Sequence, residues 1–226
     1  MKRCILCFVL AAFFAMPALA AAEIHGVYIA PKFLLGIQDS GTISTSGDTG
    51  GLKFFRQYNQ AVFGGALAVG YNFASKFNVP VRTEIEFALR SNSSNKRDGS
   101  VAGNWWSAKQ TTNLSTLFFN AYFDINTGTP FTPYIGGGLG MSFNYTEMKL
   151  EADDGSLSKS RHDTAFAWNV GAGVSYAFTE NISADLGYRF VHTSYRDVKF
   201  EAGGDRLKVG SSPYIHEFYL GARFTF

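Results

Sequence analysis

The sequence predicts an all-β fold, an eight-stranded antiparallel up-and-down barrel, and three observations support it. First, 46% of the 226 residues are hydrophobic and 16% are aromatic, yet the mean hydropathy is only −0.02. Second, apolar residues beyond the N-terminus recur at every second position, as in strands with two different faces. Third, the connections between these segments are alternately short and long. This pattern excludes intrinsic disorder, and it excludes a bundle of membrane helices, each of which needs roughly 20 consecutive apolar residues.

Residues 1–20 are typical of a cleaved secretory signal peptide, which leaves 21–226 as the mature barrel domain. Lys2 and Arg3 precede an apolar stretch over 5–16, and small residues follow at Ala18 and Ala20. We expect cleavage after Ala20, within about two residues. Loss of the two basic residues lowers the Lys and Arg count from 20 to 18, which equals the 18 acidic residues. The mature chain is therefore formally neutral, and no nucleic-acid partner is expected.

Neither thiol nor metal chemistry is expected of the mature chain. Both cysteines, Cys4 and Cys7, lie in the leader, which removes disulfides, thiol catalysis and cysteine-bound metals. His25, His162 and His216 are scattered and lack the spacing of metal ligands. The sequence therefore predicts no metal and no other cofactor.

Eight segments carry the period-two alternation. In the third segment, Val81, Thr83 and Ile85 alternate with Arg82 and Glu84, so one face is apolar and the other is charged. The predicted strands cover residues 27–37, 63–73, 81–90, 116–125, 134–145, 168–178, 182–190 and 217–226.

The connections indicate how the strands are arranged. Those after the second, fourth and sixth strands are short, at 74–79, 126–131 and 179–181. The other four are long and rich in Ser, Gly, Asn and Asp, and they cover 38–60, 91–112, 147–163 and 193–212. All tight turns then lie at one end with both termini, and four long loops lie at the other. Bacterial outer-membrane barrels have this arrangement, with the long loops outside the cell.

The two faces distinguish a membrane barrel from a soluble one. A soluble barrel turns its apolar face inward, whereas a membrane barrel turns it toward lipid. Here the polar face also holds most of the glycines, for example Gly136, Gly138 and Gly140, which suit a crowded eight-stranded interior. Aromatic residues near strand ends, such as Tyr71 and Trp168, suit the membrane interface. We therefore expect a transmembrane barrel in the outer membrane of a Gram-negative cell, in contact with outer-membrane lipid.

The polar face predicts a network of charges in the lumen. Charges that point into a narrow interior must pair, because an isolated buried ion costs several kcal/mol. An ion-pair network that fills the lumen is the favoured interpretation, and a gated path in a narrow porin or ion channel is the alternative. The residues concerned are Arg82, Glu84, Glu86, Arg90, Asp124, Asp185 and Arg189.

The C-terminal segment ends on an aromatic residue in register with the apolar face of the last strand. This pattern resembles the terminal signal that the outer-membrane assembly machinery reads, so that machinery is an expected partner. The residues of the expected signal are Phe218, Leu220, Ala222, Phe224 and Phe226.

Four stretches of the chain resemble the opacity-type surface proteins, which belong with the OmpA-like eight-stranded barrels. They are 80–87 (PVRTEIEF), 120–124 (NAYFD), 132–136 (TPYIG) and 186–190 (LGYRF). The resemblance covers nearly all of the mature chain, and its motifs lie in barrel strands. It implies a surface antigen whose long loops engage host molecules or other cells. We therefore expect a porin-like barrel with a non-catalytic function, namely membrane integrity and adhesion or surface interaction through those loops.

One motif raises an enzymatic alternative. His192 and Ser194 are similar to the His-x-Ser pair of lipid A deacylases, and by strand parity His192 faces lipid. Such a histidine requires an acid to orient it. The residue after the serine is Tyr195, where that family has asparagine, and the candidate acids are poorly spaced. We therefore favour a non-enzyme over a lipid A-modifying hydrolase. The candidate acids are Glu201, Asp205 and Glu217.

Trp105 and Trp106, close to Lys109 in the second long connection, are candidate loop contacts. Adjacent aromatic residues beside a cation can form a contact for a protein or glycan. They can also lie on lipid headgroups as an anchor, which is the interpretation we favour.

Overall fold

The computed structural model describes residues 25–39, 44–46, 59–101, 104–152, 155–194, 196–202, 205–211 and 213–226, so the predicted leader lies outside it. None of the helices in these ranges is long and apolar enough to cross a membrane. One short helix, α2, covers Ala74–Phe77. The strands are β1 (Val27–Asp39), β2 (Ser44–Ser46), β3 (Asn59–Asn72), β4 (Val81–Arg90), β5 (Ser93–Val101), β6 (Asn104–Asp124), β7 (Phe131–Ala152), β8 (Gly155–Ala177), β9 (Ile182–Thr193), β10 (Arg196–Ala202), β11 (Asp205–Ser211) and β12 (Tyr214–Thr225).

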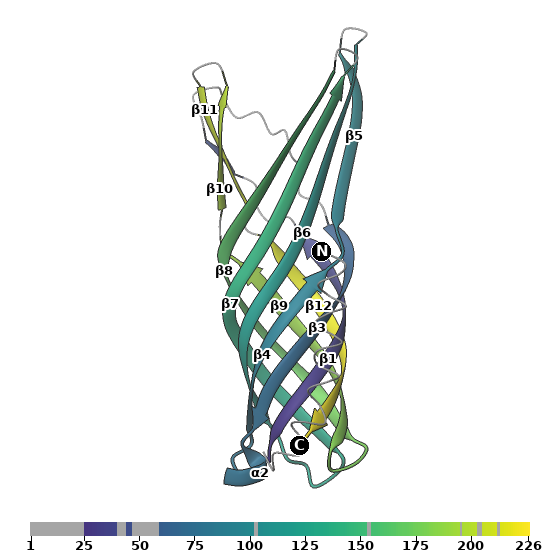
Figure 1. The fold of residues 1–226 in the computed structure, drawn as a ribbon, viewed down its shortest axis with the longest axis vertical. Coiled ribbons are helices and arrows are strands. Elements are labelled where there is room, and N and C mark those ends of the chain that lie inside the picture. Colours follow the sequence, from purple (N-terminus) through teal and green to yellow (C-terminus); the bar gives the residue numbers. More distant parts are fainter. Residues whose placement is uncertain are drawn as a thin grey trace.

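Within the described residues, eight strands close into an antiparallel ring (Figure 1). The order is β1, β3, β4, β6, β7, β8, β9 and β12, and pairing of β12 with β1 closes the ring. Each predicted strand lies within one of these eight to within one residue at its end. The predicted fold class is therefore confirmed.

The two faces of the ring follow the alternation in the sequence. Outward side chains are apolar and exposed, for example Phe33 at 56% and Leu139 at 62%. Inward positions hold charged side chains such as Glu86 and Glu217, which are fully buried. Burial of charge inside and exposure of apolar residues outside is the inverse of a soluble barrel, as the sequence predicts.

Glycine and tyrosine form matched cross-strand pairs inside the ring. In each pair the tyrosine ring covers the glycine directly opposite it on the next strand. At Gly173, an added Cβ would lie 2.6 Å from Cζ of Tyr134, so only glycine leaves room for that ring. Such pairs fix the register of neighbouring strands. They are Tyr28–Gly70, Tyr122–Gly136, Tyr134–Gly173 and Tyr219–Gly187.

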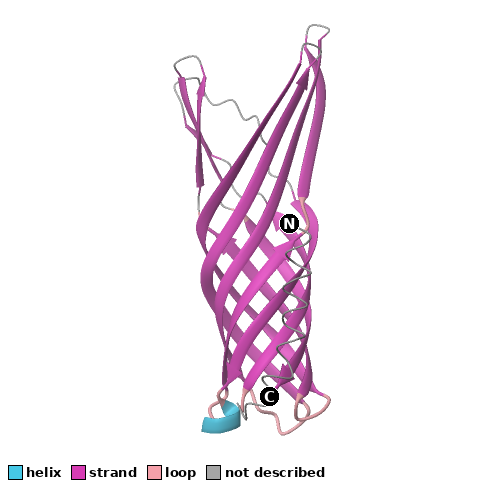
Figure 2. Cartoon of the chain, in the orientation of Figure 1, coloured by secondary structure: helices cyan, strands magenta, loops and turns pink. Residues whose placement is uncertain are grey.

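The outer end differs from the sequence prediction. Segments 91–112 and 147–163, expected to be long loops, are mostly strand, because β6, β7 and β8 continue far past the ring and β5 pairs with β6 (Figure 2). A separate sheet is formed by β10, β11 and β2. Residues 148–152 do alternate between apolar and charged residues, but the Ser, Gly, Asn and Asp content of these segments favoured loops in the sequence prediction. We call the part of β5–β8 beyond the ring the outer extension (residues 93–112 and 146–162).

The opposite end carries the short connections. The first holds α2, which ends at Asn78 in the left-handed conformation (φ 54°). Gly128 in the second turn also has a positive φ, of 71°. The C-terminus lies at this end, as the alternation of short and long connections predicts (Figure 2).

Candidate functional site

The charged residues singled out from the sequence all lie on the inner face of the ring. β4 supplies Arg82, Glu84, Glu86 and Arg90, and the remaining three come from β6 and β9. Six of the seven are buried, and the side chain of Asp124 is 15% exposed. Sequence reasoning missed three further members on β1 and β12. These are Lys32, Glu217 and Arg223, which are also buried.

Lys32 joins two carboxylates inside the lumen. Its Nζ lies 2.5 Å from Oε1 of Glu84 and 2.7 Å from Oε2 of Glu86. Glu84 also accepts hydrogen bonds from the hydroxyls of Tyr28 and Tyr122, at 3.2 and 2.8 Å. Because β3 lies between β1 and β4 in the ring, the contacts of Lys32 with these two carboxylates pass over the intervening strand.

Arg189 and Arg90 extend the network toward the outer end. Nη1 of Arg189 lies 2.6 Å from Oε1 of Glu86, and its Nε lies 2.8 Å from Oε2 of Glu217. Arg90 donates to both oxygens of Glu217, at 2.8 and 3.0 Å. Glu86 and Glu217 therefore each accept from two cations.

The network is looser near the short turns. Arg82 forms a two-pronged pair with Asp124, with distances of 2.7 and 2.8 Å. Asp185 lies 4.0 Å from Nη1 of Arg82 and 3.6 Å from Nη2 of Arg223. These distances allow electrostatic attraction but are too long for hydrogen bonds.

Among the described residues, the paired charges of the lumen balance. Five cations face five carboxylates, so the buried interior carries no net charge from these groups. This balance matters because each unpaired ion in a low-dielectric interior costs several kcal/mol. We call the set the lumen ion-pair network: Lys32, Arg82, Arg90, Arg189 and Arg223 with Glu84, Glu86, Asp124, Asp185 and Glu217.

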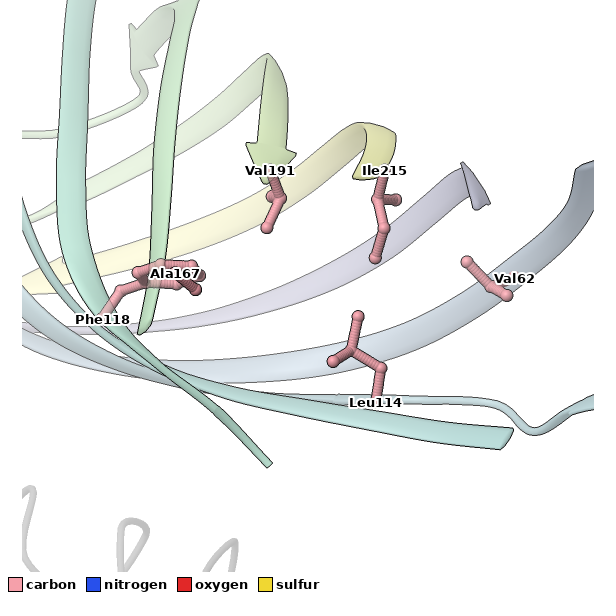
Figure 3. Packing of buried hydrophobic residues seen from close by; sticks show 6 residues of the cluster. All are labelled: Val62, Leu114, Phe118, Ala167, Val191 and Ile215. Atoms are coloured by element: carbon pink, nitrogen blue, oxygen red, sulfur yellow. The ribbon is translucent and has the colours of Figure 1, made fainter. Parts of the chain in front are cut away.

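A second, apolar set of inward side chains lies nearer the outer end. Ile215 precedes Glu217 on β12, and Val191 follows Arg189 on β9, so each is one inward position farther out than the network. The six members are buried and pack into one cluster from five strands (Figure 3). We call them the apolar layer: Val62, Leu114, Phe118, Ala167, Val191 and Ile215.

The other predicted site residues are placed as follows. Trp105 and Trp106 lie in the extended part of β6 rather than in a loop, and Lys109 beside them is exposed. Phe218 and Leu220 of the expected assembly signal point outward on β12, with 58% and 57% of their surface exposed. Ala222, Phe224 and Phe226 follow at the end of the chain and are partly exposed.

His192 lies on the outer face of β9, as strand parity predicts, but its surroundings are aromatic. Its ring stacks on Trp168 with centroids 5.5 Å apart, and its Nδ1 has no hydrogen-bond partner among the described residues. Glu217, one candidate acid, points into the lumen toward Arg90. The side chains of Glu201 and Asp205 lie outside the described residues. No described carboxylate therefore orients His192.

A closed antiparallel ring with an apolar exterior and a paired, charged interior defines an outer-membrane β-barrel. The family model described as "Outer membrane protein beta-barrel domain" matches residues 6–226, and the chain belongs to this family. The protein is accordingly an outer-membrane protein.

Individual proteins show the same likeness. The chain is 28% identical over 228 residues to "Outer membrane protein PagN" of Salmonella typhimurium, which covers 94% of each chain. It is 23% identical over 170 residues to "Putative adhesin RC1281" of Rickettsia conorii, with 72% of this chain and 67% of that one covered. Among solved structures, the outer membrane protein OprG of Pseudomonas aeruginosa has a TM-score of 0.50 at 18% identity, with 89% and 97% covered. This last likeness supports the fold alone.

Proposed function

We propose that the protein is a non-catalytic surface protein whose filled barrel supports membrane integrity and whose outer strands bind a ligand on a host cell or another cell. The observation that carries this proposal is the division between a filled ring and strands that continue beyond it. β7 and β8 have 22 and 23 residues, whereas about 9–11 suffice to cross a membrane. The excess lies outside the cell, where it can meet a partner.

The surface of the outer extension suits contact in water. Its ion pairs are exposed, including Lys96 with Asp98 at 3.3 Å and Lys149 with Glu147 at 3.2 Å. Such pairs add little to stability, so their presence does not account for the length of these strands. The name of the Rickettsia conorii relative, which calls it an adhesin, supports the same function.

Truncation of one hairpin tests the adhesive part of this proposal. Thr146 and Arg161 face each other across β7 and β8, so residues 147–160 can be replaced with an Asn-Gly turn. We expect this variant to lose most of its attachment to cultured host cells. The matched control replaces residues 197–210 between Arg196 and Ser211, which shortens the β10–β11 hairpin. Unchanged attachment after the first truncation would contradict the proposal.

Bilayer recordings test whether the lumen is filled. The pairs Arg189–Glu86 and Arg90–Glu217 join strands on different sides of the ring, and the apolar layer joins five strands, which favours closure over the narrow-porin alternative. We expect no current steps above background from the purified barrel. Regular open steps would instead show a conducting pore.

Protease treatment of whole cells tests the orientation. Lys159 lies in the outer extension, whereas Lys76 lies in α2 among the short turns. We expect trypsin to cut at Lys159 and to spare Lys76 until the cells are lysed. Cleavage at Lys76 in intact cells would instead show that the short turns face the outside of the cell.

The proposed assembly signal has its own test. We expect Phe226→Ser to reduce the amount of barrel in the outer membrane, because the last aromatic residue of the outward row is lost. Thr225→Ser, a neighbouring change off that row, serves as the control. Normal insertion of the Phe226 variant would contradict the proposal that Phe226 is part of an assembly signal.

A further inference from the structure

The outer surface of the ring has an apolar hollow over β6, β7 and β8. Small residues, Ala121 and Gly137, lie between the larger side chains of Phe119, Leu139 and Trp168, and the exposed wall is almost entirely apolar. Farther along β6 and β7, toward the short turns, the outer face carries the larger residues Phe123 and Ile135, which are exposed to about half of their surface. The hollow is therefore a local depression in a surface that contacts lipid.

A cluster of rings with two imidazoles lies beside this hollow on β8, β9 and β12. His192 stacks on Trp168, and the ring of His216 lies 5.3 Å from that of Phe190. The hydroxyl of Tyr188 is 2.6 Å from Nδ1 of His216. We call this cluster the aromatic–histidine patch: Trp168, Tyr188, Phe190, His192, Tyr214 and His216.

The strand register joins the hollow to the patch. One row of directly paired residues runs Phe119, Leu139, Trp168, His192 and Tyr214 across five strands. At β6 this row lies five residues from the short-turn end of the strand, whereas at β12 it lies at the first residue of the outer end. The row therefore rises from the apolar belt to the outer rim. His192 is two strands from Leu139, or about 10 Å at the usual strand spacing.

The imidazoles at the rim suit a phosphorylated headgroup. When Tyr188 donates to Nδ1 of His216, the proton of the neutral ring lies on Nε2, and this exposed side chain can donate outward. Nδ1 of His192 has no partner among the described residues but is buried, so a phosphate can reach it only if the ring turns outward. An ordinary aromatic belt needs only apolar and ring surface, so two histidines within it indicate recognition of a polar group.

We infer that the hollow and the aromatic–histidine patch form one binding site for a phosphorylated, acylated lipid of the outer leaflet. One acyl chain lies in the hollow over Gly137, and the phosphate meets His192 and His216 at the rim. The occupant is a lipid because the site is continuous with the surface of the barrel that contacts the membrane. The site does not include the outer extension, so the test of lipid binding and the test of adhesion can fail independently of each other.

Trp168 provides a reporter for this site. The chain has three tryptophans, and W105F with W106F leaves Trp168 as the sole tryptophan, which can be excited selectively at the red edge of tyrosine absorption. The protein is placed in vesicles of brominated phosphatidylcholine, which quench Trp168, and bisphosphorylated lipid A is titrated in as the probe. Displacement of brominated lipid restores the fluorescence of Trp168. The midpoint of the titration therefore measures the preference of the site for lipid A over phosphatidylcholine. We expect the midpoint for dephosphorylated lipid A to lie at a concentration at least fivefold higher than the midpoint for the bisphosphorylated form.

Two variants separate the parts of the site. H192F with H216F keeps the rings but removes the imidazoles, so we expect a midpoint at least fivefold higher for the bisphosphorylated lipid and unchanged for the dephosphorylated one. A121F fills the hollow, so we expect weaker displacement by both lipids. H162F, which alters another histidine packed on a ring, and A61F, on the outer face of β3, are the controls.

The inference is overturned if the imidazole and hollow variants stay within twofold of the parent, or if the controls lose displacement equally. Equal midpoints for the two forms of lipid A in the parent protein would also overturn it. Folding of every variant is checked by the mobility difference between heated and unheated samples on a detergent gel.

Discussion

The lumen contains two buried regions that resist change for different reasons. In the ion-pair network, the position of each side chain is set by a partner on another strand, as with Arg189 between Glu86 and Glu217. In the apolar layer, side chains such as Leu114 and Phe118 need only fill space. A register slip of one residue would move every charge to the lipid side, whereas an apolar residue would be tolerated there. The network therefore specifies the arrangement of the strands, and the layer excludes water.

The largest expected effect comes from removal of a cation from the network. We expect Arg189→Met to destabilise the barrel by about 4 kcal/mol, because four cations then face five carboxylates in a buried site. Unfolding in urea from lipid vesicles measures the loss. A second substitution, Glu217→Gln, restores the charge balance, so the double variant should lose less than the sum of the single ones. Additive losses would mean that charge balance is not what stabilises this region.

Truncation of a side chain in the apolar layer should lower the free energy of unfolding somewhat less than Arg189→Met does. We expect Leu114→Ala to destabilise by about 3 kcal/mol, because the layer is left with a cavity. Leu139→Ala on the outer face is the matched control, since lipid can fill the space left there. The same urea titration compares the two variants. Equal losses would indicate that the layer is loosely packed.

The glycine–tyrosine pairs link the two regions through register. We expect Gly187→Ala to destabilise by about 2 kcal/mol, because the new Cβ would lie 2.4 Å from the ring of Tyr219. At Gly65 the nearest atom to an added Cβ is 3.7 Å away, so Gly65→Ala should be neutral or slightly stabilising. Thermal unfolding of the two variants distinguishes crowding from a general effect of alanine.

The smallest effect is expected for an ion pair outside the lumen. Lys149 and Glu147 are 3.2 Å apart, and half of the Lys149 side chain is exposed. Water screens such a pair, so Lys149→Ala should change the free energy of unfolding by less than about 0.5 kcal/mol. A loss comparable to that of Arg189→Met would show that exposure is not what separates the two kinds of pair.

The ring could be predicted from sequence because lipid and lumen impose opposite chemistry on alternate residues. The parity that placed Arg82 and Glu84 inside also places Lys32, Glu217 and Arg223 there, so the same signal could have found the whole network. Which cation meets which carboxylate could not be predicted, because the pairs join strands far apart in the chain.

Other features of the structure depend on the strand register, or lie in segments whose polar composition resembles that of loops. Phe118 points inward although it is large and apolar, and only the neighbouring strands reveal the layer that it joins. The pairing of Tyr219 with Gly187 depends on strand alignment, which composition does not encode. The outer extension was expected to be loop because its segments are rich in Ser, Gly, Asn and Asp, although β7 keeps an apolar alternation at Met148, Leu150 and Ala152.

The unbroken course of β7 and β8 from the ring into the outer extension has a mechanical consequence. About 12 of the 23 residues of β8 exceed what a membrane crossing needs, which corresponds to roughly 40 Å of strand. Because hydrogen bonds to β7 continue along this length, the far end stands on a stiff stalk and not on a tether. The height at which the cell meets a partner is then set by strand length, so shortening the hairpin in steps of two residues should lower that height in equal increments.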